Sequence, residues 1–259
     1  MQLLSLLISL VASATARGVA PTSYHDIEIP DITATVQLPP PPSKNPPDNH
    51  IGDFISGPET PLVVDAETKA KLEELAKAYQ KVGFDNYPLI IKTLKLEAKP
   101  APAKNVRILI TFAYNGVAAT SGTPQGPRIQ VSAKYALAHP DDLGMIVHEM
   151  VHVVQSYKHY NGAEAPGWLV EGIADYVRWF FYEPLSVHPH PKAATADARG
   201  SYRITGAFLF WASGKYNPDL VPKLNVALQA DTYTEGLFKD LTGKTLDELN
   251  AEWKASLAT

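Results

Sequence analysis

The sequence predicts an α+β fold in which helices dominate. Short runs of β-branched or alternating apolar residues, typical of strands, lie before residue 133. After residue 140, apolar residues recur mainly at the spacing of amphipathic helices. With 259 residues, 45% of them hydrophobic, the chain can bury a normal core. We therefore expect a small antiparallel or mixed sheet and a mostly helical C-terminal part.

Residues 1–16 have the pattern of a secretory signal peptide. An apolar run at Leu3–Val11 follows Met1, and the small residues Ala12-Ser13-Ala14 and Ala14-Thr15-Ala16 fit a cleavage site. The run is too short to span a bilayer. A buried strand or helix is the alternative interpretation. We expect a secreted, extracellular protein that has no membrane segment once the signal is removed.

Residues 17–61 form a proline-rich extension. The run Leu38–Pro47 favours an extended, polyproline-like chain, because proline neither continues a helix nor donates to a strand ladder. Upstream, His25–Ile29 alternates like a short strand. This extension could be a linker, a strap on the domain or a pro-segment. The main domain is then residues 62–259.

The first half of that domain mixes helix and strand signals. Asp65 fits a helix N-cap, and an apolar stripe follows it at helical spacing. The elements expected up to residue 132 are a helix to about Val82 that ends near Gly83, a helical stretch at Leu89–Leu94, a strand at Val106–Phe112, a loop at Ala119–Pro127 and a strand at Arg128–Ser132.

The second half predicts helices separated by turns. Pro140 and two following acids suit the first turn of a helix that runs to about Tyr157. Thr245 with Glu248 suits a capping box, and Asp219 or Asn217 a further N-cap. The elements expected after this helix are helices at Leu169–Tyr182, Ile204–Ser213, Leu220–Gln229, Thr234–Thr242 and Thr245–Leu257, with an irregular stretch at Pro184–Pro191.

The residues His148-Glu149-Met150-Val151-His152 carry the clearest chemical signal. Positions four apart share one face of a helix, so both imidazoles point the same way and can hold one Zn²⁺. Glu149, beside the first histidine, can act as a general base. Two surface or core histidines would show the same spacing, so further residues decide the interpretation.

Glu171 and Asp175 supply those further residues. A catalytic zinc needs a third protein ligand and an open position. Glu171 lies nineteen positions after His152 on a second predicted helix, and a turn between the two helices can bring it back against the histidines. Asp175 shares the face of Glu171 and could accept a hydrogen bond from a ligand imidazole. The sequence therefore predicts zinc bound by His148, His152 and Glu171, with Asp175 behind them.

Composition excludes several other classes of protein. The chain has no cysteine, which excludes disulfides, thiolate metal sites and a cysteine nucleophile. Its net charge of −4, with lysine and arginine scattered, gives no basic surface for nucleic acid. No Gly-x-Ser-x-Gly elbow is present, which argues against a serine hydrolase. The pair His188 and His190 alternates with prolines and predicts an exposed loop rather than a second metal site.

The same residues resemble a known family. His148-Glu149-x-x-His152 with Glu171-x-x-x-Asp175 is similar to the glutamate-zincin pattern. The chain resembles the plant basic secretory protein family, with its fungal and bacterial relatives, in five runs: Ile129–Ala133, His148–Gln155, Trp168–Arg178, Tyr202–Leu209 and Gly243–Leu249. The resemblance covers residues 64 to 257 and implies a secreted, zincin-like fold with peptidase activity. This chain departs from the family by being acidic.

These observations predict a zinc metalloendopeptidase that acts on protein or peptide substrates as a monomer. Glu149 would take a proton from the zinc-activated water and pass it to the leaving amine. A donor to the oxyanion is also needed, and Tyr202 is our first candidate, ahead of Tyr160, Tyr157 and Arg203. The strand Arg128–Ser132 could pair with an extended substrate.

Two alternatives remain open on sequence. One is a zinc-binding defence or carbohydrate-binding module with little proteolysis, although such a module has no need of Glu149 as a base. The other is a zinc hydrolase of non-peptide bonds, which would use the same ligands.

Overall fold

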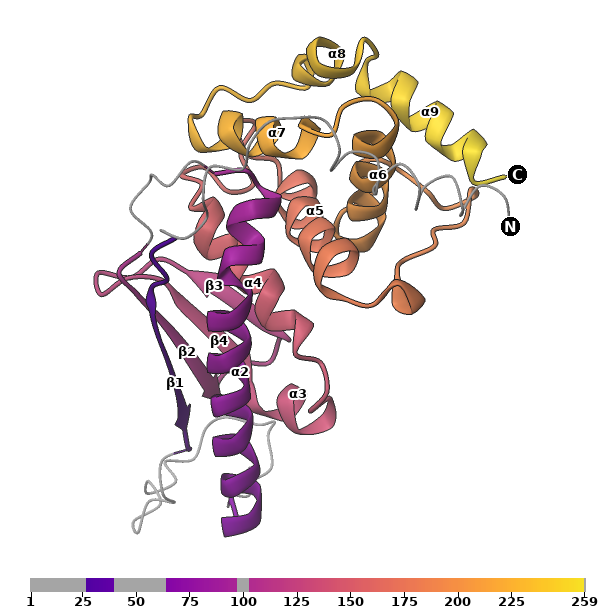
Figure 1. The fold of residues 1–259 in the computed structure, drawn as a ribbon. Helices are drawn as coiled ribbons and strands as arrows, with labels where there is room; N and C mark the ends of the chain where they lie inside the picture. Colours follow the sequence, from indigo (N-terminus) through magenta and orange to yellow (C-terminus); the bar gives the residue numbers. More distant parts are fainter. Residues whose placement is uncertain (1–26, 40–63, 97–102, 259) are drawn as a thin grey trace, which may run out of the picture.

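The computed structural model describes residues 27–39, 64–96 and 103–258. The predicted signal peptide at residues 1–16 lies outside these residues, as does most of the proline-rich extension. The expected α+β architecture is confirmed. A four-stranded mixed sheet lies with the long helix α2 in one part of the molecule, and helices α5 to α9 gather in the other (Figure 1).

The sheet has the order β1-β2-β4-β3, with β1 and β2 parallel, β2 and β4 parallel, and β3 and β4 antiparallel. Its strands are β1 (Asp31–Gln37), β2 (Asn105–Thr111), β3 (Ala118–Ser121) and β4 (Arg128–Ser132). The predicted strands at Val106–Phe112 and Arg128–Ser132 are thus confirmed, and the sheet is mixed rather than mainly antiparallel.

One strand prediction and one loop prediction were wrong. Residues 27–29 of the expected His25–Ile29 strand are not strand, and β1 begins at Asp31 instead. It still lies in the N-terminal extension, so that segment contributes an edge strand to the sheet. Strand β3 begins one residue before the expected loop Ala119–Pro127 and takes up its first three residues. Its composition gives no strand signal, and it is held by antiparallel pairing with β4.

Helix α2 (Ala66–Thr93) is a single helix where the sequence predicted two. Asp65 caps it as expected, because its side chain accepts a hydrogen bond from the Thr68 N–H at 2.6 Å. Gly83 does not end the helix. A Cβ there would lie 3.4 Å from Ile32 Cδ1 and 3.7 Å from Met150 Cγ, so at this position α2 packs against β1 and α4 at ordinary van der Waals distance.

The chain then forms α3 (Ala133–Ala138), which the sequence did not predict, α4 (Gly144–Gln155) and α5 (Gly167–Val177). Helix α4 starts later than expected, and Asp142 accepts a hydrogen bond from the Met145 N–H at 3.3 Å at this end. It ends at Ser156, whose φ of 45° turns the chain. The predicted helix Leu169–Tyr182 is α5 followed by a π-helical turn at Arg178–Tyr182.

The C-terminal part is helical, as predicted. It consists of α6 (Tyr202–Lys215), α7 (Leu220–Gln229), α8 (Gly236–Thr242) and α9 (Leu246–Ser256). Thr245 and Glu248 form the expected capping box, whereas the Asp219 side chain makes no cap bond to α7. No helix in residues 27–39, 64–96 or 103–258 is long and apolar enough to cross a membrane.

The irregular stretch Pro184–Pro191 contains one short 3₁₀ turn at Leu185–Val187. In it His190 is exposed, while the ring of His188 packs edge-on against Phe180 with ring centroids 5.0 Å apart. The two histidines therefore lie in different surroundings.

Candidate active site

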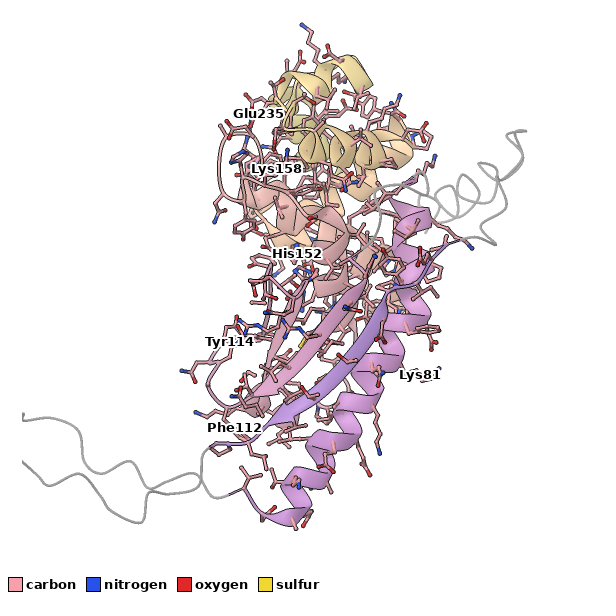
Figure 2. The ribbon with its side chains drawn as sticks, turned by 90° about the vertical axis from the view of Figure 1, so that its left-hand side faces the viewer. Lys81, Phe112, Tyr114, His152, Lys158 and Glu235 are labelled. Carbon is pink, nitrogen blue, oxygen red and sulfur yellow. The ribbon has the colours of Figure 1, made fainter. Side chains whose placement is uncertain are left out.

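Helix α4 carries the two histidines at the junction of the sheet and the C-terminal helices. In Figure 2, His152 lies at the level where these two parts meet. Most of α4 is buried, including Val147, Met150, Val151 and Val154, so the helix is held on several sides. His148 and His152, four residues apart, share the face that lines a cleft of about 1040 Å³.

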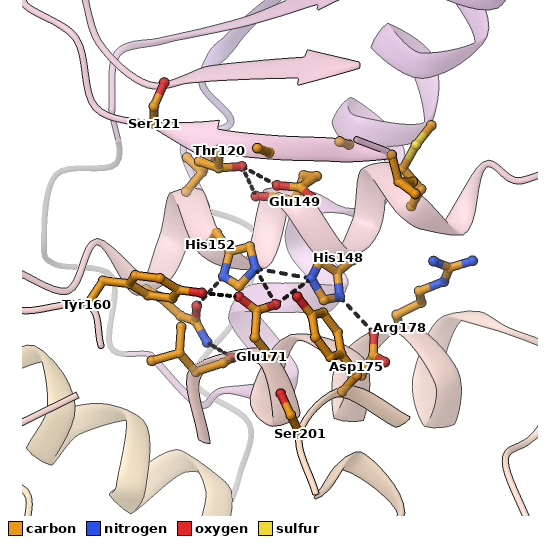
Figure 3. Close-up of a pocket in the computed structure, with 18 of the residues that line it drawn as sticks. Thr120, Ser121, His148, Glu149, His152, Tyr160, Glu171, Asp175, Arg178 and Ser201 are labelled. Atoms are coloured by element: carbon orange, nitrogen blue, oxygen red, sulfur yellow. Dashed lines mark hydrogen bonds and ion pairs between the residues drawn. The ribbon is translucent and has the colours of Figure 1, made fainter. Parts of the chain in front are cut away.

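Three atoms from α4 and α5 meet in this cleft. His148 Nε2 lies 3.1 Å from His152 Nε2 and 3.1 Å from Glu171 Oε2, and His152 Nε2 lies 3.3 Å from Glu171 Oε2 (Figure 3). The turn between the helices thus brings Glu171 back against both imidazoles, as the sequence predicted. With bonds of 2.0–2.1 Å, the ligand atoms of a tetrahedral zinc would lie about 3.3 Å apart. The triangle observed has nearly this size.

Neighbouring groups determine the tautomers of both rings. Asp175 Oδ1 lies 2.7 Å from His148 Nδ1, and a carboxylate can only accept, so this nitrogen carries the hydrogen. Gln155 donates through its Nε2 to the Val170 carbonyl, which points its Oε1 at His152 Nδ1, 2.7 Å away. His152 Nδ1 therefore donates as well. In the neutral rings both Nε2 atoms then carry lone pairs.

Three lone pairs consequently face one another in a buried place. His148 is 8% exposed and Glu171 8% exposed, so water screens this arrangement poorly. Burial lowers the pKa of His148, but the hydrogen bonds to Asp175 and Glu171 outweigh it and raise the pKa to about 10. The donor set therefore fits a cation such as zinc.

Glu149 lies beside this triangle and contributes no atom to it. Its side chain is buried and accepts a hydrogen bond from the Thr120 hydroxyl, 2.7 Å from Oε2 (Figure 3). A carboxylate adjacent to the ligands but outside their set is in place to exchange protons with a water in the cleft.

Three of the candidate oxyanion donors, Tyr157, Arg203 and Tyr160, already have partners in the structure. Tyr157 is used in packing, because its hydroxyl donates to Asn225 Oδ1 at 2.7 Å. The Arg203 guanidinium lies over the Trp179 ring at 4.2 Å. Tyr160 donates to Glu171 Oε1 at 2.7 Å and so holds the carboxylate oxygen that does not face the histidines.

Tyr202 lines the cleft with a ring that is stacked on His148, with ring centroids 6.1 Å apart. Ser201 and Tyr202 both have positive φ angles, of 65° and 45°, which are uncommon for residues other than glycine. Such conformations cost about 1–3 kcal/mol each and cluster at functional sites. Burial and the charge of Glu171 raise the pKa of Tyr202, so its hydroxyl keeps its proton and can donate.

A comparison with protein families decides the family. The profile of the BSP family, described as peptidase of plants and bacteria, matches residues 74–253, which is more than half of the chain. The chain belongs to the BSP family. It is therefore a peptidase, in agreement with the resemblance to the basic secretory proteins. No curated protein and no solved structure matches the chain.

The sheet edge of this BSP peptidase differs from the one predicted. Strand β4 (Arg128–Ser132) lies between β2 and β3, so its backbone is already paired on both sides and it cannot add a substrate strand. The edge on this side is β3, whose residues line the cleft. Part of the loop that the sequence predicted is thus a strand beside the cleft.

Two residues that bond the candidate site residues, Gln155 and Thr120, were not predicted from the sequence. Gln155 lies three positions after His152, on the same helix face, and that spacing could have indicated it as the partner of His152. Thr120 had no signal, since it lies 29 positions before Glu149 in a stretch without strand character.

Proposed function

We propose that this peptidase is a secreted zinc metalloendopeptidase, with zinc bound by His148, His152 and Glu171. The observation that carries the proposal is the convergence of two imidazole lone pairs and one carboxylate oxygen, 3.1–3.3 Å apart, with both opposite ring nitrogens already donating. When both rings are neutral, these three atoms all present lone pairs to the same point. A bound cation would satisfy these three lone pairs best.

Bound zinc would polarise the scissile carbonyl and lower the pKa of a water. The chain supplies the rest. Glu149 takes the proton of the attacking water and gives it to the leaving amine. Asp175 and Gln155 keep the two rings in their ligand tautomers, and Tyr160 holds the free oxygen of Glu171.

Tyr202 is the proposed donor to the carbonyl oxygen as it gains charge. Its support is the ring stacked on His148, its place in the cleft and a hydroxyl that stays protonated. Edge strand β3 is the proposed pairing partner for an extended peptide, because its outer backbone groups face no other strand of the sheet. Secretion rests on residues 1–16 alone.

The test is metal content and hydrolysis measured on one preparation. Purified protein should contain about one zinc per chain, digest casein or a peptide library, lose this activity to a chelator and regain it with zinc. Zinc without any digestion would favour the binding module instead. Digestion that survives complete removal of metal would refute the proposal.

A further inference from the structure

The Thr120 hydroxyl has two acceptors of Glu149 within reach and has no part in the mechanism described so far. Its Oγ1 lies 2.7 Å from Glu149 Oε2 and 3.1 Å from the main-chain oxygen of the same residue (Figure 3). Both acceptors belong to one residue of α4, whereas Thr120 belongs to the sheet. The hydroxyl therefore ties the proposed base to a second element.

The register of the sheet determines where this hydroxyl points. Thr120 pairs with Ile129 of β4, which is fully buried. Successive side chains of a strand point to opposite faces, so the neighbours Ala119 and Ser121 cannot take its place. The branched side chain of threonine also has few rotamers. Thr120 is thus presented to Glu149 by a fixed backbone.

A hydroxyl suits a base that changes its protonation state. It carries one hydrogen and two lone pairs. While Glu149 is ionised, the shorter contact to Oε2 is a charge-assisted hydrogen bond. Once Glu149 has taken a proton, the same hydrogen can turn to the main-chain oxygen, which is also in reach. A hydrogen bond is kept in both states.

We propose that Thr120 is a positioning residue for Glu149. It holds Oε2, so that Oε1 is the oxygen that exchanges the proton with the water and the leaving amine. No atom of Thr120 is consumed or transferred. This inference rests on the proposed function, because it assumes that Glu149 is the base.

The experiment compares Thr120→Val, which keeps the shape and removes the hydroxyl, with Thr120→Ser, which keeps the hydroxyl. Thr232→Val is the matched control, since Thr232 is exposed and its hydroxyl bonds only a main-chain oxygen at 3.4 Å. The readouts are zinc content, kcat and KM on a peptide substrate, and the melting temperature of the metal-free protein.

Thr120→Val should keep about one zinc per chain and a KM within about twofold, while kcat falls about 10- to 100-fold, the loss typical of a hydrogen bond to a charged group. It should also lower the melting temperature of the metal-free protein. Thr120→Ser and Thr232→Val should stay close to the wild type in every readout.

Three results would overturn the inference: an unchanged kcat in Thr120→Val, a rise in KM alone, or a serine variant as slow as the valine variant. Activity of the wild type distinguishes failure of the proposed function from failure of the role given to Thr120. If the wild type has no zinc-dependent hydrolysis, the proposed function fails and the inference with it. If the wild type is active and Thr120→Val matches it, the inference fails by itself.

Discussion

Gly172 lets α5 approach α6 directly beside the proposed ligand Glu171, and alanine there should destabilise the protein. An added Cβ would lie 2.2 Å from Thr205 Cγ2 and 2.6 Å from Thr205 Cβ. Thr205 is fully buried, and its hydroxyl donates to the Ala198 carbonyl at 2.8 Å, so it cannot turn away without losing that bond. Overpacking of this kind costs about 3 kcal/mol.

Helix propensity acts in the other direction. Alanine is favoured over glycine in a helix interior by about 1 kcal/mol. The net loss for Gly172→Ala is therefore about 2 kcal/mol, which corresponds to a melting temperature lower by about 4–8 °C for a domain of this size. Because α5 also carries Asp175, zinc affinity should fall with stability.

Thermal unfolding of four variants tests this reasoning. Thr205→Ser removes the methyl group nearest to the added Cβ and keeps the hydroxyl, so the double variant Gly172→Ala/Thr205→Ser should be more stable than the sum of the single effects predicts, by about 0.5–3 kcal/mol. Gly236→Ala is the control, since its Cβ would meet only Thr234 Oγ1 at 3.5 Å. The reasoning is refuted if Gly172→Ala melts like Gly236→Ala, or if the double variant is strictly additive.

Three further predictions concern single side chains. Asp175→Ala leaves the His148 Nδ1–H without its acceptor and should weaken zinc binding about 10- to 100-fold in a competition titration with a chelator; an unchanged affinity would contradict the role of Asp175. Tyr160→Phe removes the donor to Glu171 and should weaken zinc binding about fivefold. A large fall in kcat at unchanged zinc affinity would instead make Tyr160 the oxyanion donor. Two lysines and a tyrosine lower the pKa of Glu252 from 4.5 to about 2. Since the folded-state pKa is the lower one, this carboxylate stabilises the fold above pH 4.5, and the stabilisation fades as the pH falls toward 2. Melting curves of wild type and Glu252→Gln should therefore differ at pH 7 and converge in acid; a constant difference would exclude the ionisation as its cause.

The parts of the fold that depend on neighbouring residues could be predicted from the sequence. The cap at Asp65, the capping box at Thr245 and the strand Val106–Phe112 are local signals, and each has its counterpart in the structure. The same holds for the shared face of His148 and His152, which needs only the helical period.

The parts that depend on distant residues could not. Gly83 gives a helix-end signal, but α2 continues through it, packed against Ile32 and Met150, which no local pattern contains. Strand β3 exists because β4 pairs with it, and Thr120 reaches Glu149 only through that pairing. At Gly83 and in β3, contacts between residues distant in the sequence override the local composition.

The central claim is that the convergent site holds zinc while Glu149 moves the proton. Glu149→Gln tests it most directly, because glutamine preserves the shape and the hydrogen bond from Thr120 but is no base. The account predicts about one zinc per chain in this variant and hydrolysis reduced by at least about 100-fold. A Glu149→Gln protein that binds zinc and cleaves peptides at the wild-type rate would contradict it.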